Sequence, residues 1–247
     1  MYGWRGRIGI IVPSSDRTTE MDFHELKPEG VAVYVSRVLL PEANDPKKKM
    51  EALQQMDAQI PYAAKLLAAV EPDIIAFCCT TGSFLEGVGT DKRIINMIES
   101  KTGVEAITTS TALIEALRYL GISKIDLLTP YNVEIGAIAR EFLQETIPNL
   151  EIVGFKDLGI IGGLDKCKVS PYRIYLEAKE LVTPTSEALL ISCTALQTLP
   201  IINVLERDIG KPVITSNNAT MWLALRKLGI RHSIENGGQL LRKLSAG

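Results

Sequence analysis

The chain carries Ile-Ile-Ala-Phe-Cys-Cys-Thr-Thr-Gly-Ser at residues 74–83 and Leu-Leu-Ile-Ser-Cys-Thr at residues 189–194, and these two stretches decide its fold. Each begins as a short aliphatic run, which is typical of a strand buried on both faces. Each then changes to cysteine and threonine before a helical pattern or a cap. We therefore predict two strands that each deliver a cysteine, Cys79 or Cys193, to a helix start, with the two cysteines facing each other across one small-molecule site.

The same alternation of strand and helix runs through the rest of the chain. Apolar runs rich in β-branched residues predict further strands at 7–12, 30–36, 104–108, 124–129, 151–155 and 212–215. Apolar residues at helical spacing predict helices at 50–70, 91–100, 111–120, 133–145, 170–181, 199–209 and 219–228. Strands that alternate with helices are typical of α/β folds built on parallel sheets.

An internal repeat divides this pattern into two halves. Residues 7–13 resemble residues 124–130, and residues 107–122 resemble residues 215–230. The two Cys-Thr stretches lie between these matches, so all three matches occur in the same order in both halves. We infer two pseudo-symmetric α/β units, each a parallel sheet of roughly four strands flanked by helices, with the active site in the cleft between them.

The repeat also predicts where the two units begin and end. The first unit is expected at residues 1–115, completed by a C-terminal helix at residues 216–247. The second unit is expected at residues 116–215. No linker rich in Gly, Ser or Pro separates the halves, so we expect the units to pack tightly.

The composition excludes several classes of protein. The 247 residues are 46% hydrophobic with a net charge of −2, which is typical of a globular protein and argues against nucleic-acid binding. No apolar run approaches the roughly 18 residues of a membrane span, and no secretory signal is evident, so a cytoplasmic protein is expected. The longest basic run, at residues 47–49, is interpreted as a solvated helix start.

The four cysteines are expected to be thiols, because a chain of this length with two adjacent cysteines does not suggest a disulfide framework. Only two histidines are present, and neither belongs to a metal-binding spacing, so no metal is expected. Cys78 and Cys167 have no partner in the repeat and are interpreted as packing residues. Cys79 and Cys193 are the catalytic candidates, since a helix start lowers the pKa of a thiol.

Polar side chains at the ends of the strands supply the candidate substrate-binding residues. Hydroxyl groups and backbone amides at such turns bind carboxylates and stabilise the charge that develops on them. The candidates are Ser14, Asp16, Thr80, Thr81, Tyr131 and Thr194. Asn217 and Asn218 either line the site or cap a helix. The loop Gly159-Ile160-Ile161-Gly162-Gly163 lacks the order of a dinucleotide fingerprint and is a candidate lid.

These motifs together resemble the aspartate/glutamate racemase superfamily, most closely its maleate cis-trans isomerase and arylmalonate decarboxylase branch. The resemblance covers nearly the whole chain and rests on the two Cys-Thr stretches and on four further segments. These are Val-Pro-Ser-Ser at 12–15, Thr-Thr-Ser-Thr-Ala at 108–112, Thr-Pro-Tyr at 129–131, and residues 210–217 with Trp222 after them. Arylmalonate decarboxylases have glycine at the position of Cys79, so two cysteines favour the isomerases and racemases.

The resemblance implies a mechanism without a cofactor. Cys79 would add to the double bond of maleate, the new single bond would rotate, and elimination would give fumarate, while Cys193 supplies and recovers a proton. Thr80, Thr81 and Tyr131 would hold the substrate carboxylates. The resemblance also implies a homodimer.

Asp16 departs from the family pattern, which usually has asparagine after Pro-Ser-Ser. An ionised aspartate repels a substrate carboxylate but suits an ammonium group, which raises the alternative of an Asp/Glu-type amino-acid racemase that uses the two thiols as acid and base. Asp16 could instead cap a helix without touching substrate. An arylmalonate-type decarboxylase and a non-catalytic carboxylate-binding protein remain further alternatives.

Overall fold

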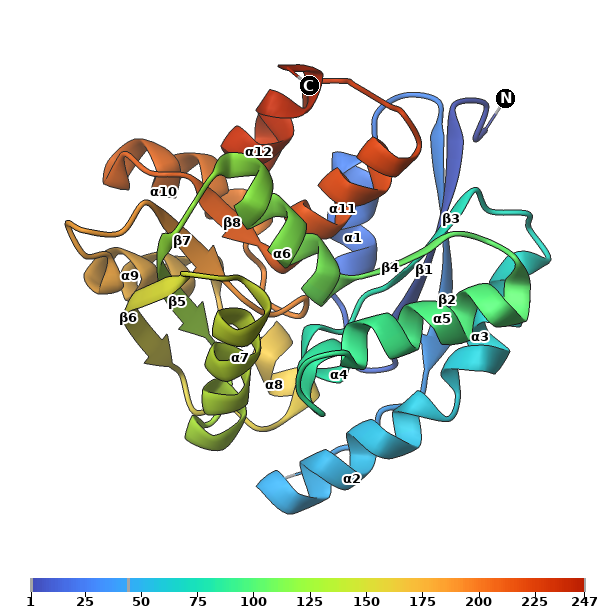
Figure 1. Cartoon of the computed structure of the whole chain (residues 1–247), viewed down its shortest axis with the longest axis horizontal. Helices are drawn as coiled ribbons and strands as arrows, with labels where there is room; N and C mark the ends of the chain where they lie inside the picture. The colour runs from blue at the N-terminus through green and yellow to red at the C-terminus, as the bar shows by residue number, and fades with distance from the viewer. Residues whose placement is uncertain (1, 44, 247) are drawn as a thin grey trace.

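The computed structural model describes residues 2–43 and 45–246 and contains two parallel sheets, one in each half of the chain (Figure 1). The first sheet has the order β2 (Val31–Val38), β1 (Gly6–Pro13), β3 (Ile74–Phe77) and β4 (Ala106–Thr108). The second has the order β6 (Glu151–Asp157), β5 (Lys124–Thr129), β7 (Ala188–Ile191) and β8 (Val213–Thr215). Because the second sheet repeats the order of the first, the predicted fold of two α/β units is confirmed.

The central strands are short and apolar because helices cover both of their faces. Every residue of β3 and β7 is buried, which matches the aliphatic runs in the sequence. Strand β6 at the edge of the second sheet is mostly half-buried. The central strands of the two sheets therefore fix where the loops at their C-terminal ends lie.

Each strand is followed by one or two α-helices. They are α1 (Thr19–Leu26), α2 (Pro46–Asp57), α3 (Ile60–Ala68), α4 (Thr80–Phe84), α5 (Thr90–Thr102), α6 (Thr109–Leu120), α7 (Val133–Thr146), α8 (Gly163–Cys167), α9 (Pro171–Leu181), α10 (Ile202–Ile209), α11 (Ser216–Lys227) and α12 (Gly238–Arg242). Short 3-10 turns η1 (Leu199–Ile201), η2 (Glu235–Gly237) and η3 (Lys243–Ala246) precede α10 and flank α12.

The prediction of one helix over residues 50–70 is wrong, because the segment forms the two helices α2 and α3. Pro61 lies in the first turn of α3, where its missing N–H group costs nothing. Within a continuous helix the same proline would remove a hydrogen bond and clash with the preceding turn. The helix predicted at 199–209 likewise starts as the 3-10 turn η1, which contains Pro200.

Helices α6 and α11 pack against each other where the two sheets meet (Figure 1). Residues 216–225 of α11 are all buried, although several of them are polar. This helix contacts strands β3 and β4 of the first sheet as well as β8 of the second. Because α11 contacts both sheets, the unit boundaries at 1–115, 116–215 and 216–247 stay a prediction.

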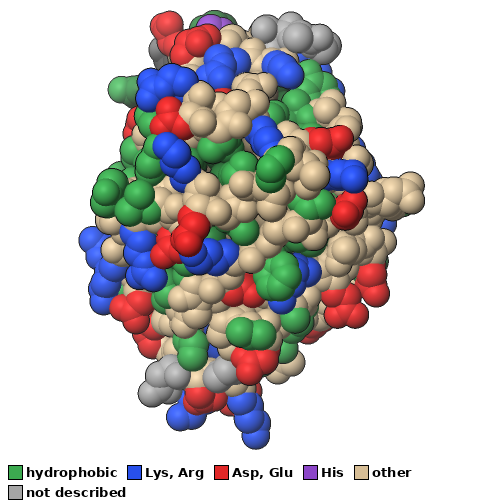
Figure 2. Space-filling model, turned by 90° about the vertical axis from the view of Figure 1, so that its left-hand side faces the viewer, with side chains coloured by type: hydrophobic (Ala, Val, Ile, Leu, Met, Phe, Trp, Pro, Cys, Tyr) green, Lys and Arg blue, Asp and Glu red, His purple; other side chains and the backbone are tan. Residues whose placement is uncertain are grey.

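The surface carries no evident concentration of charge on the face drawn in Figure 2, where Lys and Arg side chains are interspersed with Asp and Glu. Within residues 2–43 and 45–246, no helix has the length and apolar character that crossing a bilayer requires.

Candidate active site

Cys79 lies at the turn from β3 into α4. It is the N-cap residue of that helix, with extended backbone angles, and the Gly82 backbone N–H donates to its Sγ at 3.4 Å. The side chain is 6% exposed. A thiol that accepts a helix N–H is held in one orientation, and the same bond stabilises its thiolate. The sequence prediction of a cysteine at a helix start is correct for Cys79.

Cys193 follows β7 without starting a helix, so the prediction of a helix start at Cys193 is wrong. The Ser192 backbone N–H donates to Leu128 O at 2.9 Å, which extends the strand pairing to the residue before the cysteine. A turn then follows, closed by the Leu196 N–H on Cys193 O at 3.3 Å. Burial raises the pKa of Cys193, and the backbone N–H of Ala195, rather than a helix terminus, offsets part of this rise.

Both cysteines line one cavity at the C-terminal ends of the two sheets. The loops after β1, β3, β5 and β7 all contribute, as is general for ligand sites of open α/β sheets. The lining residues are Pro13, Ser15, Asp16, Leu40, Lys49, Leu53, Cys79, Thr80, Thr81, Tyr131, Gly163, Lys166, Cys193, Thr194 and Ala195. The structure therefore brings the two thiols together with five of the six predicted substrate-binding residues.

The exception is Ser14, which does not line the cavity. Its hydroxyl accepts a hydrogen bond from the Leu40 backbone N–H at 3.1 Å and ties the loop after β1 to the end of β2. The neighbouring Ser15 lines the cavity instead.

Asp16 lines the cavity, but its carboxylate is bound to the start of α1. Oδ1 accepts from the backbone N–H groups of Thr18 and Thr19 at 2.8 and 2.9 Å, and Oδ2 accepts from the Thr19 hydroxyl at 2.7 Å. The residue is 4% exposed. The N-cap residue of α1 is Thr18, so Asp16 binds the helix start from two residues before it. Its bonds take up lone pairs that a substrate ammonium would need.

Thr80 and Thr194 each use one polar group to bind a neighbouring element of the fold. The hydroxyls of Thr80 and Ser216 of α11 form a hydrogen bond at 3.0 Å. The backbone carbonyl of Thr194 accepts from Asn217 Nδ2 at 2.9 Å. Asn217 also donates to Asp22 of α1 at 2.7 Å, so this buried amide connects α1, α11 and the turn beside Cys193.

Asn217 therefore positions the turn without lining the cavity. Asn218 completes a capping box with Thr215, so the capping interpretation is the one the structure supports for it.

Tyr131 presents a hydroxyl without a hydrogen-bond partner among the described residues. The residue is 0% exposed and lines the cavity. Burial raises its pKa well above the usual 10, and the neighbouring Cys193 raises it further. The Thr81 and Cys193 side chains are close enough to influence this pKa, but neither has hydrogen-bond geometry with the hydroxyl. A buried donor without a partner is costly, so it favours a ligand oxygen at this place.

Burial dominates the electrostatics of both thiols. It raises the pKa of Cys79 to about 12, partly offset by the Gly82 N–H and by the charge of Lys49. It also raises the pKa of Cys193, with Lys166 as the largest opposing influence. The expectation that a helix start lowers the pKa below the ordinary value is therefore wrong for the free protein. Both cysteines are protonated thiols near neutral pH.

The two lysines in this cavity were not singled out from the sequence. Lys49 was interpreted as part of a solvated run, yet it is 3% exposed, and this interpretation is wrong. Its spacing from Leu53 and Met56 places it on the apolar face of α2, which is the signal that could have identified it. Lys166 is 4% exposed, and its place in a five-residue helix offers no comparable pattern.

The remaining cysteines lie outside the cavity. Cys78 is fully buried, with its thiol directed at Ala76 O at 3.6 Å, and Cys167 donates to Ser15 O at 3.5 Å. All four cysteines are free thiols, as predicted. Gly163 lines the cavity, and Gly159–Gly162 border a larger outer hollow with Glu42 and Asp165. A lid role for this loop stays a prediction.

Comparisons with known proteins agree with this geometry. The family model described as arylmalonate decarboxylase matches residues 8–241. The chain is 26% identical to a maleate isomerase of Geobacillus stearothermophilus over 249 residues, which covers 95% of this chain and 96% of the relative. It is 31% identical to an arylmalonate decarboxylase of Bordetella bronchiseptica over 159 residues, which covers 63% of this chain and 65% of the relative.

A solved structure shows the same fold. It is a cysteine-to-serine mutant of Nocardia farcinica maleate cis-trans isomerase with a covalently bound succinylcysteine intermediate. The TM-score is 0.89 at 22% identity, and the match covers 96% of this chain and 98% of the other.

Proposed function

The chain belongs to the arylmalonate decarboxylase family of enzymes, and from this premise we propose that it isomerises a small unsaturated dicarboxylate such as maleate with its two thiols. One observation carries the proposal, namely that Cys79 and Cys193 line a single buried cavity. The decarboxylase alternative needs only one of these cysteines, whereas addition and elimination across a double bond uses both.

The proposed reaction begins when the Cys79 thiol loses its proton to water, which leaves the thiolate. Its sulfur forms a bond to one alkene carbon of maleate, and the electron pair of the double bond moves to the other carbon, whose carboxylate becomes enediolate-like. The Cys193 thiol protonates that carbon and leaves a saturated thioether, which rotates about the new single bond. Cys193 then takes the proton back and the carbon–sulfur bond breaks. Fumarate is released, and the Cys79 thiolate is formed again.

The surroundings of the thiols support this sequence of steps. The Gly82 N–H and the positive charge of Lys49 are the groups that favour the thiolate form of Cys79. The free hydroxyl of Tyr131 offers a hydrogen bond to a carboxylate as it gains enediolate charge. The succinylcysteine found in the Nocardia farcinica enzyme is an adduct of the kind that this route forms.

An amino-acid racemase is the second candidate, because Asp16 lines the cavity and an aspartate suits a substrate ammonium. The hydrogen bonds from Thr18 and Thr19 to its carboxylate weaken this candidate. A racemase would use the same two thiols on opposite faces of one carbon.

Proton NMR in D₂O separates these functions. We expect the vinyl signal of maleate to decay while that of fumarate grows, and we expect neither change with Cys79→Ser or Cys193→Ser protein. Exchange of the α-proton of aspartate or glutamate, without any change in maleate, would establish the racemase instead. Loss of carbon dioxide from an arylmalonate would establish the decarboxylase, and no change in any substrate would leave only carboxylate binding.

The homodimer and the cytoplasmic location stay predictions. Light scattering coupled to gel filtration tests the first, because a dimer has twice the 27.1 kDa mass of the chain.

A further inference from the structure

Two buried lysines, Lys49 of α2 and Lys166 of α8, line the cavity together with the thiols. Lys49 is 3% exposed and Lys166 is 4% exposed. Within residues 2–43 and 45–246, no carboxylate oxygen lies within 4.0 Å of either Nζ, and neither ammonium donates a hydrogen bond to a protein group. The protein contact of Lys166 Nζ is with the face of the Tyr131 ring, whose centroid lies 5.0 Å away. Lysine is almost never fully buried without a partner, so these two side chains need an explanation.

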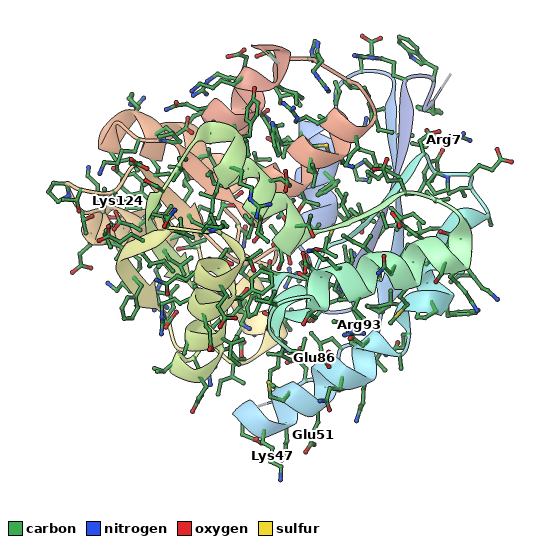
Figure 3. The ribbon with its side chains drawn as sticks, in the orientation of Figure 1. Arg7, Lys47, Glu51, Glu86, Arg93 and Lys124 are labelled. Atoms are coloured by element: carbon green, nitrogen blue, oxygen red, sulfur yellow. The ribbon has the colours of Figure 1, made fainter. Side chains whose placement is uncertain are left out.

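Exposed lysines beside them are paired, which makes the contrast sharp. Lys48 Nζ lies 3.6 Å from Asp45 Oδ2, and Lys168 Nζ lies 2.8 Å from Asp165 Oδ1. Both pairs are at the protein surface. Lys47 and Glu51 of α2 point away from the molecule (Figure 3). The carboxylates of Asp45 and Asp165 thus pair with exposed lysines. Glu42 is close enough to raise the pKa of Lys166 but forms no ion pair with it, so the ammonium groups in the cavity are left for a ligand.

Burial and a neighbouring like charge both act against the ammonium form of Lys166. Burial is the largest influence and lowers the pKa of Lys166, and the charge of Lys49 lowers it further, while Cys193, Cys79 and Glu42 act in the opposite direction. The carboxylate of Asp16 is bound to Thr18 and Thr19, and it forms no ion pair with either lysine. An anion that enters the cavity therefore relieves both the repulsion and the loss of hydration.

The two lysines also follow the pseudo-symmetry of the fold. Helix α2 follows β2, and α8 follows β6, the strand in the equivalent position of the second sheet. Lys166 follows Lys49 by 117 residues, as residue 124 follows residue 7 at the start of the repeat. Each half of the chain thus contributes one thiol and one ammonium to the cavity. A ligand with two similar charged ends suits such an arrangement.

We propose that Lys49 and Lys166 are specificity-determining residues that bind the two negatively charged ends of the substrate, so that the site selects small dianions over monoanions and zwitterions. This inference rests on the proposed function, because it assigns substrate recognition to the same cavity. It also bears on the racemase alternative. The ammonium group of an amino acid would enter a cavity that already holds two lysine side chains without a carboxylate partner.

Isothermal titration calorimetry with unreactive ligands tests the inference without turnover. We expect the protein to bind succinate at least about tenfold more tightly than butyrate or L-aspartate, since only succinate has two carboxylates and no ammonium. Lys49→Met and Lys166→Met should each weaken succinate binding at least about tenfold and change butyrate binding much less. Lys48→Met and Lys168→Met are matched controls from the same helix or its end, and both should bind succinate as the unmodified protein does.

Urea unfolding of each variant guards against a trivial loss of fold. Replacing a buried unpaired charge by methionine should leave the unfolding midpoint unchanged or raise it. Equal affinity for succinate and butyrate, or unchanged succinate binding in both buried-lysine variants, overturns the inference.

The outcome is independent of the proposed reaction. If the protein prefers dianions but does not turn over maleate, the isomerase proposal is wrong and the lysines still determine which anion binds. If maleate is turned over and its KM is unchanged in both methionine variants, the isomerase proposal stands and the role of the lysines is wrong.

Discussion

Asp22 of α1 provides a pH-dependent test of how the halves are joined beside the site. It is 7% exposed, and its Oδ2 accepts a hydrogen bond from Asn217 Nδ2 at 2.7 Å. No cation among the described residues lies within 4.0 Å of its carboxylate. Burial raises its pKa from 3.8 to about 7, against the lowering effect of the Asn217 bond, with smaller increases from Asp16 and Glu25.

The sign follows from proton linkage. The native state holds the Asp22 proton more tightly than the unfolded chain does, so this residue stabilises the fold most below about pH 4. That stabilisation disappears as the pH rises to about 7, where the native state must bury a carboxylate. A pKa raised from 3.8 to about 7 corresponds to about 4 kcal/mol at ~1.4 kcal/mol per pH unit.

Asp22→Asn removes the titration and keeps an oxygen for the Asn217 bond. We expect the free energy of unfolding of this variant, relative to the unmodified protein, to increase by about 4 kcal/mol between about pH 4 and pH 8. The variant should be the more stable protein at the upper end. Urea unfolding curves recorded across this range give the difference directly.

Asp208→Asn is the control of opposite sign. The pKa of Asp208 is lowered from its ordinary value, chiefly by the Tyr175 hydroxyl, which donates to its Oδ2 at 2.6 Å. Its replacement should therefore destabilise the protein by an amount that is constant between about pH 4 and pH 8 and disappears as the pH falls below about 4. A stability difference between Asp22→Asn and the unmodified protein that stays constant with pH would refute the reasoning about Asp22.

Three further predictions concern the cavity. Cys79→Ser and Cys193→Ser should each lower kcat for maleate at least about 1000-fold with an unchanged far-UV circular dichroism spectrum, and retained activity in either would remove the two-thiol route. Tyr131→Phe deletes a hydroxyl without a protein partner, so kcat should fall about 10- to 100-fold while the unfolding midpoint is unchanged or raised; a clear loss of stability would show that the hydroxyl has a structural partner. Gly163→Ala would place a Cβ 2.5 Å from Ser15 Oγ, so the KM for maleate should rise at least about threefold. An unchanged KM would show that Ser15 can move aside without loss of substrate binding.

The sequence by itself determined the architecture and the first thiol. Strand and helix periods are local properties, because they depend on which side chains lie on each face of an element. The repeat then required two similar sheets, and the matching orders β2-β1-β3-β4 and β6-β5-β7-β8 confirm this. Cys79 was chosen over Cys78 because successive strand residues point to opposite faces and only Cys79 has an equivalent in the repeat.

Only the tertiary structure decided the charge and the reactivity of the cavity. Lys49 belongs to a basic run that sequence rules assign to solvent, and its burial depends on α2 packing over the end of the sheet. Lys166 is buried, and the thiol pKa values are raised, because groups more than a hundred residues apart in sequence exclude water from one cavity. Desolvation depends on every atom that surrounds a group, so no local pattern of residues could have indicated it.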